Sequence, residues 1–129
     1  MNKILILDNS KLMKGIITKI LSRSGFYSIV DANDNTSAVK LYNATHPDLV
    51  AMDITKDIKK RINIVREILN INPMAKIIVI TAMGQEDFMK QCIAMGVKDC
   101  IVRPYSEYRV LSAVLNALNN WKNSSGVFI

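Results

Sequence analysis

Residues 3–10 read KILILDNS, an apolar run that ends abruptly on an acid and an amide. Within the run, apolar and polar residues do not alternate, which is typical of a strand covered on both faces of a parallel sheet. A second run of this kind, KIIVI at residues 76–80, lies much further along the chain. Both runs predict buried parallel strands, and Asp8 and Asn9 then lie where the first strand ends.

Helical patterns separate the strand-like runs. The apolar residues between the runs recur at helical spacing. Gly25 and Gly96 are expected to end the first and fourth helices. The third helix is expected to begin near Ile62, and Ser106 is expected to cap the fifth. Five strand–helix pairs need right-handed crossovers, and therefore predict a doubly wound, three-layer α/β domain. The strands are expected at residues 3–7, 27–31, 49–52, 76–80 and 99–102.

The composition limits the class of protein. The 129 residues suffice for one globular domain, expected over residues 1–122 with a C-terminal tail at 123–129. No signal peptide or membrane-spanning run is present, so a cytoplasmic protein that does not contact membranes is expected. The net charge is +6, but the basic residues are scattered, which disfavours direct nucleic-acid binding. Cys92 and Cys100 are expected to be free, buried thiols.

The predicted strand ends carry the chemistry. Sites in parallel sheets form outside the carboxyl ends of the strands, and here those ends carry two acids, an amide, a hydroxyl and a cation. Two carboxylates and an amide oxygen suit Mg²⁺. A carboxylate can also accept a phosphoryl group, with a cation to neutralise the transferred oxygens. The residues concerned are Asp8, Asn9, Asp53, Thr81 and Arg103.

Four segments at these strand ends resemble the receiver domain of bacterial two-component response regulators, known best from the chemotaxis regulator. They read ILILDNSKLMK, LVAMDIT, IIVITAMG and CIVRPY, and the resemblance runs from Lys3 to about Leu118. The resemblance implies a flavodoxin-like (βα)5 fold, with a five-stranded parallel sheet in the strand order 2-1-3-4-5. It also implies a phosphoacceptor signalling domain rather than an enzyme.

The resemblance implies a role for each site residue. Asp53 matches the phosphoacceptor, and Asp8 matches the first of the acidic pair that holds Mg²⁺. Thr55 matches the position whose backbone carbonyl binds the metal. Thr81 matches the hydroxyl that moves onto the phosphoryl group. The implied metal ligands are therefore Asp8, Asn9, Asp53 and Thr55.

Two substitutions alter this site, one in its charge and one in the geometry of its cation. Asn9 stands where the family has its second acid, so the formal charge with Asp8, Asp53 and Arg103 is about −1 instead of about −2, and Mg²⁺ binding weaker than usual for the family is expected. Arg103 replaces the usual lysine, and its planar fork can grip a carboxylate or a phosphate. Arg103 can therefore pair with Asp53, stand in for the metal or compete with phosphorylation. Pro104 matches a proline whose preceding peptide bond is commonly cis.

The loop after Asp53 and the fifth strand also depart from the family. Residues 55–61 lack the usual proline and glycine, so a rearranged loop or an early start of the third helix is expected. The basic residues of this loop are read as a solvated surface, with recognition of an acidic partner or of the phosphoryl group as the alternative. Cys100 stands where the family often has an aromatic that moves on activation. The four basic residues are Lys56, Lys59, Lys60 and Arg61.

The leading hypothesis is a receiver domain that accepts a phosphoryl group on Asp53 from a sensor histidine kinase, with Mg²⁺. The modified domain then switches a face made by the fourth helix, fifth strand and fifth helix toward a downstream protein target, and these helices are also a candidate homodimer surface. The alternative is a pseudo-receiver, a protein-interaction module that does not depend on phosphorylation. A flavodoxin-like nucleotide binder ranks lower, because the first loop lacks a glycine-rich cradle. A hydrolase ranks lowest, because no Ser/His or Cys/His set is present.

Overall fold

The computed structural model describes residues 3–7, 11–23, 25, 28–32 and 35–118. These residues form a parallel sheet in the order β2-β1-β3-β4-β5, with β1 next to β3 at the point where the chain reverses its winding. The doubly wound parallel α/β fold predicted from the sequence is confirmed. The strands are β1 (Lys3–Leu7), β2 (Ser28–Ala32), β3 (Leu49–Asp53), β4 (Ile77–Thr81) and β5 (Asp99–Val102).

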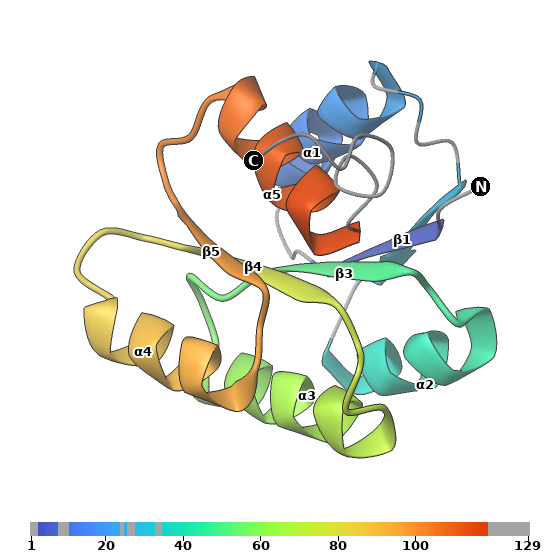
Figure 1. Cartoon of the computed structure of the whole chain (residues 1–129), viewed down its shortest axis with the longest axis vertical. Helices are drawn as coiled ribbons and strands as arrows, with labels where there is room; N and C mark the ends of the chain where they lie inside the picture. Colours follow the sequence, from blue (N-terminus) through green and yellow to red (C-terminus); the bar gives the residue numbers. More distant parts are fainter. Residues whose placement is uncertain (1–2, 8–10, 24, 26–27, 33–34, 119–129) are drawn as a thin grey trace, which may run out of the picture.

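Helices cover both faces of the sheet. Figure 1 shows α1 and α5 on one face and α2, α3 and α4 on the other. This is the three-layer arrangement that parallel strands need, because both of their faces are apolar. The helices are α1 (Lys11–Arg23), α2 (Asn35–Thr45), α3 (Ile58–Ile71), α4 (Glu86–Met95) and α5 (Glu107–Leu118).

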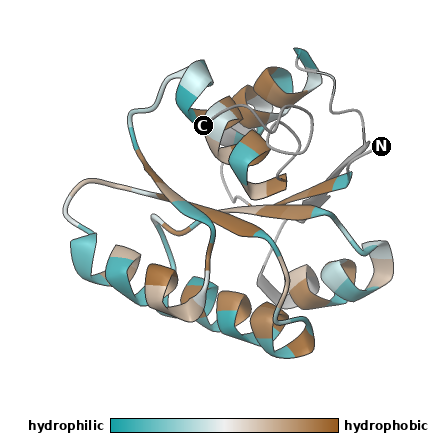
Figure 2. Cartoon of the chain, in the orientation of Figure 1, coloured by the Kyte–Doolittle hydropathy of each residue, from teal (hydrophilic) through white to brown (hydrophobic). Residues whose placement is uncertain are grey.

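The strands supply two hydrophobic cores, one on each side of the sheet. Every residue of β4 is buried. Ile78 and Ile80 pack into the core under α1 and α5, whereas Ile77 and Val79 pack into the core under α2, α3 and α4. Because successive side chains of a strand point to opposite faces, a strand between two cores is apolar at every position. Figure 2 shows the result as largely hydrophobic strands in the centre of the sheet, with mixed helices on both sides.

Most predicted helix ends are confirmed. Gly96 follows α4 with a φ of 111°, and Gly25 follows α1 with a φ of 91°, a conformation that favours glycine. The Ser106 hydroxyl accepts a hydrogen bond from the Arg109 N–H at 3.0 Å, as a cap of α5 should. None of the described helices is long and apolar enough to cross a membrane.

The third helix corrects one prediction. It begins at Ile58 and not near Ile62, so the earlier of the two expected starts is the one that forms. Asp57 precedes it with a φ of 51° and a ψ of 43°, the left-handed conformation that a glycine adopts with less strain. A short polar residue tolerates this conformation better than a branched one, so Asp57 can make a turn in which glycine is otherwise favoured.

Candidate phosphoacceptor site

The carboxyl ends of β3, β4 and β5 bring three predicted site residues to one edge of the sheet. Asp53 is the last residue of β3, Thr81 is the last residue of β4, and Arg103 follows β5 directly. The strands are in register: Asp53 pairs with Ile80, the residue before Thr81, and Thr81 pairs with the residue before Arg103. Asp8 and Asn9, which would follow β1 at this same edge, lie outside the described residues.

The carboxylate of Asp53 is almost buried and fully engaged. Its side chain is 6% exposed. Oδ1 accepts hydrogen bonds from the Thr55 N–H at 2.7 Å and from the Thr55 hydroxyl at 2.6 Å. Oδ2 accepts from the Arg103 guanidinium, with which it forms an ion pair. Both carboxylate oxygens therefore accept hydrogen bonds, and the guanidinium supplies a charge-assisted bond in a place that water barely reaches.

Arg103 also contacts the main chain of β4. Its N–H donates to the Thr81 carbonyl at 2.9 Å, and the Arg103–Pro104 peptide bond is cis, as expected from the resemblance. The Arg103 side chain is 27% exposed, so the ion pair with Asp53 lies at the border between protein and solvent. Of the roles left open from the sequence, pairing with Asp53 is the one that the structure shows.

The Thr81 hydroxyl stands out among the polar groups at this edge. Thr81 is fully buried, and its Oγ1 has no hydrogen-bond partner within the described part of the chain. A buried hydroxyl without a partner is costly, and such groups mark sites where a ligand or an ion completes the hydrogen bonding. The loop that follows is held by the Gln85 side chain, whose Oε1 accepts from the Ala82 N–H at 2.7 Å.

Sequence reasoning missed Arg61. It was read as part of a solvated basic loop, but this interpretation is wrong, because its side chain is only 1% exposed. Its Nη1 donates to the Asp53 carbonyl at 2.8 Å and to the Leu7 carbonyl at 3.1 Å. By contrast, Lys59 and Lys60, in the same turn of α3, are exposed as expected.

A periodic signal for Arg61 was present in the sequence. The buried residues of α3 recur at spacings of three and four, which is the pattern of the buried face of a helix. Arg61 is the first of this series once the helix begins at Ile58. An assumed start near Ile62 left it in the loop and hid the pattern. The buried residues of α3 are Arg61, Ile62, Ile64, Val65 and Ile68.

The donor types of the described residues fit a hard divalent ion only in part. Asp53 offers a carboxylate and Thr55 a backbone carbonyl, both oxygen donors of the kind that Mg²⁺ takes. The described residues contain no group of three or more His, Cys, Asp or Glu side chains that could hold a metal. Both carboxylate oxygens of Asp53 also carry other donors. A metal at Asp53 would therefore share the carboxylate with Arg103 or displace it.

A second arginine links α5 to the neighbouring strand β5. Arg109 forms a bidentate ion pair with Asp99, with two bonds of 2.8 Å, and donates to the Cys100 carbonyl at 3.0 Å. The hydrogen bond from Arg109 lowers the pKa of Asp99, against the opposing effect of burial. Burial raises the pKa of the Cys100 thiol to about 11 and also raises that of Cys92. Both cysteines are buried and free, as predicted.

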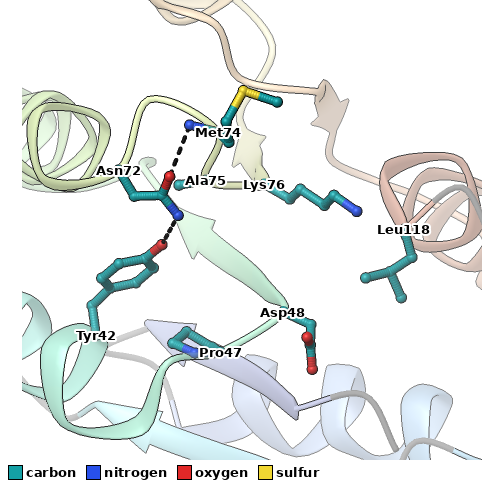
Figure 3. Close-up of a pocket in the computed structure, with 8 residues that line it drawn as sticks. All are labelled: Tyr42, Pro47, Asp48, Asn72, Met74, Ala75, Lys76 and Leu118. Atoms are coloured by element: carbon teal, nitrogen blue, oxygen red, sulfur yellow. Dashed lines mark hydrogen bonds between the residues drawn. The ribbon is translucent and has the colours of Figure 1, made fainter.

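A different kind of pocket lies at the opposite edge of the sheet. It has a volume of about 170 Å³ and is drawn in Figure 3. The Asn72 amide donates to the Tyr42 hydroxyl at 3.2 Å, and its oxygen accepts from the Met74 N–H at 3.0 Å. These bonds link Asn72 to the Tyr42 hydroxyl and to the main chain of Met74. The pocket is lined by Tyr42, Pro47, Asp48, Asn72, Met74, Ala75, Lys76 and Leu118.

Comparison with known proteins agrees with this geometry. Residues 4–115 match the family model described as "Response regulator receiver domain". The chain belongs to this family, whose members are signalling domains of two-component systems that generally accept a phosphoryl group and use Mg²⁺.

Particular relatives span nearly the whole chain. "Protein CcdB" of Bacillus subtilis is 38% identical over 93% of this chain and 100% of its own length. The chemotaxis protein CheY of B. subtilis is 39% identical, covering 92% of this chain and 98% of the relative. CheY of Thermotoga maritima is 37% identical, and the match covers 87% of this chain and 93% of the length of the relative.

Solved structures share the fold. A receiver domain protein from Clostridium thermocellum has a TM-score of 0.86 at 23% identity, and the match covers 96% of this chain and 99% of the matched chain. The CheX–CheY–BeF3–Mg²⁺ complex from Borrelia burgdorferi matches with a TM-score of 0.79 at 31% identity, covering 89% of this chain and 87% of the matched chain. The resemblance read from the sequence is confirmed.

Proposed function

We propose that this chain accepts a phosphoryl group on Asp53 from a sensor histidine kinase and thereby changes its affinity for a downstream protein. The observation that carries the proposal is the convergence of a carboxylate, a cation and a buried hydroxyl without a described partner at the ends of β3, β4 and β5. These groups are Asp53, Arg103 and Thr81. A phosphoryl group on Asp53 would supply the acceptor oxygens that the Arg103 guanidinium and the Thr81 hydroxyl can bond.

The transfer itself needs little covalent help from the protein. A carboxylate oxygen of Asp53 attacks phosphorus, the P–N bond of a phosphohistidine breaks, and the imidazole leaves with the electron pair and takes up a proton. Because Arg103 holds Oδ2 in this structure, it must shift from the carboxylate to the transferred oxygens as the new bond forms. Arg103 thus pairs with the Asp53 carboxylate before transfer and neutralises the phosphoryl oxygens afterwards.

The proposed metal ligands are Asp8, Asn9, Asp53 and the Thr55 carbonyl. A bound Mg²⁺ would neutralise phosphoryl oxygens and orient them. Asn9 contributes an oxygen but no charge, so the affinity for Mg²⁺ is expected to be lower than in receiver domains with two acids at these positions. A titration in which Asn9→Asp leaves the Mg²⁺ affinity unchanged would contradict this part.

The proposed output face lies around α4 and α5. Ile93 on α4 and Tyr108 on α5 are large, exposed hydrophobic residues, and so is Met83 in the loop before α4. Such residues are enriched where proteins bind one another. A coupling between Asp53 and this face would act through Thr81 and β5, which are adjacent in the sheet.

The pseudo-receiver remains the second candidate, because one observation favours it. The Asp53 carboxylate is already neutralised by Arg103 and bonded by Thr55, and it is almost inaccessible. If Asp53 stays bonded to Arg103 and Thr55, it is not phosphorylated. The protein would then act only by binding other proteins through its surface.

One experiment separates the two candidates. The protein is incubated with acetyl phosphate, with and without Mg²⁺, and its intact mass is measured. A gain of one phosphoryl group that is lost in Asp53→Asn supports the receiver. Exposed Asp57→Asn is the matched control and must still gain the group. No gain at any Mg²⁺ concentration supports the pseudo-receiver.

A further inference from the structure

We propose that the Arg61 guanidinium is a fixed internal cation of the acceptor site, which positions the main chain of Asp53 and weakens the binding of divalent cations there. The inference rests on the proposed metal site at Asp53. It concerns a residue that the sequence analysis read as part of a solvated loop and to which the family resemblance gave no role.

The contacts of Arg61 reach both strands that frame the site. Its Nη1 donates to the carbonyl of Asp53 at 2.8 Å and to the carbonyl of Leu7 at 3.1 Å. Leu7 is the last residue of β1, and Asp53 is the last residue of β3, the neighbouring strand. One guanidinium group from the first turn of α3 therefore joins the carboxyl ends of these two strands.

The burial of this cation makes it electrostatically effective. An arginine stays protonated in proteins, so at 1% exposure Arg61 places a permanent positive charge inside the protein. Water and salt screen such a charge far less than a surface charge. Its donor nitrogen lies 2.8 Å from an atom of the acceptor residue itself, so the field of this charge acts on anything bound at Asp53.

The charge balance then differs from the one that the sequence predicted. With Arg61 added to Asp8, Asp53 and Arg103, the formal charge of the site rises from about −1 to about zero. A site with no net negative charge attracts a divalent cation weakly. The same two guanidinium groups favour the doubly negative phosphoryl group. Fixed arginine charges thus replace part of the neutralisation that Mg²⁺ would provide.

A purely structural role makes a different prediction. Arg61 could serve only to satisfy two buried carbonyls, in which case its charge would be irrelevant to cation binding. Any effect of its removal on Mg²⁺ would then be an indirect weakening caused by a disturbed main chain. The charge effect has the opposite sign, because the loss of a positive charge tightens cation binding.

The test is a Mg²⁺ titration of the unphosphorylated chain of 129 residues by calorimetry, with no phosphodonor present. Arg61→Gln removes the charge and keeps an N–H donor, whereas Arg61→Met removes both and fills similar volume. Arg61→Lys keeps the charge. Lys60→Gln is the matched control, since it removes an exposed charge from the adjacent position.

Arg61→Gln and Arg61→Met are expected to lower the Kd for Mg²⁺ by at least about fivefold, which is the Coulomb effect of a unit charge roughly 8 Å from a divalent ion in a water-like dielectric. Arg61→Lys and Lys60→Gln are expected to stay within about twofold of the parent chain. Circular dichroism identifies the variants that fold, and either neutral variant suffices.

An unchanged or raised Kd in the folded neutral variants would overturn the inference, as would the absence of Mg²⁺ binding in every variant. The failure of the proposed function is distinguishable, because it appears as a missing phosphoryl mass gain. The inference is tested without any phosphodonor.

Discussion

Asp53→Asn should destabilise this protein. The substitution keeps the shape of the side chain and removes its charge. The amide oxygen can still accept the two hydrogen bonds from Thr55, which now go to Oδ1. The amide nitrogen then faces Arg103, a donor against a donor, and the guanidinium loses its counter-ion.

The size of the effect follows from the burial of the pair. Removal of one partner of a fully buried ion pair costs about 3–5 kcal/mol. Arg103 is 27% exposed, so water can solvate it after the change and the cost is lower. We expect the free energy of unfolding to fall by about 1–3 kcal/mol, which moves the urea midpoint down by about 0.5–1.5 M.

The assay is urea unfolding followed by circular dichroism at neutral pH. Glu67→Gln on the exposed side of α3 is the matched control, because it changes the formal charge equally, and its free energy of unfolding should stay within about 0.5 kcal/mol of the parent. A midpoint for Asp53→Asn that is unchanged or raised would refute the reasoning. Such a result would mean that the buried carboxylate destabilises the folded state and that the ion pair with Arg103 does not compensate for this.

Three further predictions test other parts of the site. Thr81→Val should leave the free energy of unfolding unchanged or raise it by about 1 kcal/mol, because the lost hydroxyl has no partner among the described residues. The retention of the phosphoryl group on the chain should fall. A large loss of stability in urea would contradict this prediction. Asp57→Gly should raise the free energy of unfolding by up to about 1 kcal/mol, since the residue has a φ of 51°, and a lowered urea midpoint would argue against strain there. Asp99 has a pKa lowered by Arg109, so its contribution to stability is present above the unfolded pKa of about 3.9 and is lost as the pH falls through the lower folded value. Arg109→Met should therefore lose stability at neutral pH and differ less from the parent near pH 2, and melting curves with a constant difference across this range would oppose the assignment.

The sequence was sufficient to predict the fold because two of its strands contain unbroken apolar runs, ILIL at residues 4–7 and IIVI at residues 77–80. Residues 76–80 show this pattern, and the structure places Ile77 and Ile78 in different cores on opposite faces of the sheet. Glycines and caps then marked most helix ends, since Gly96 and Ser106 act through local chemistry that is visible in sequence. Such local signals need no knowledge of the tertiary structure.

The site was predictable only where its residues follow the strand ends. Asp53, Thr81 and Arg103 lie there, and the parallel sheet brings them together. The burial of Arg61 was not predicted, because it depends on where α3 begins. That start depends on the left-handed conformation of Asp57, which residue type alone does not predict. The choice of Arg103 to pair with Asp53 likewise depends on tertiary distances.

The most direct test of the account is to locate the phosphoryl group. The chain is treated with acetyl phosphate and Mg²⁺ and then reduced with borohydride, which converts an aspartyl phosphate to homoserine, and the peptides are sequenced by mass spectrometry. The account predicts homoserine at position 53 and none in Asp53→Asn. A phosphoryl group at any other residue, or unmodified Asp53 in the parent chain, would contradict it.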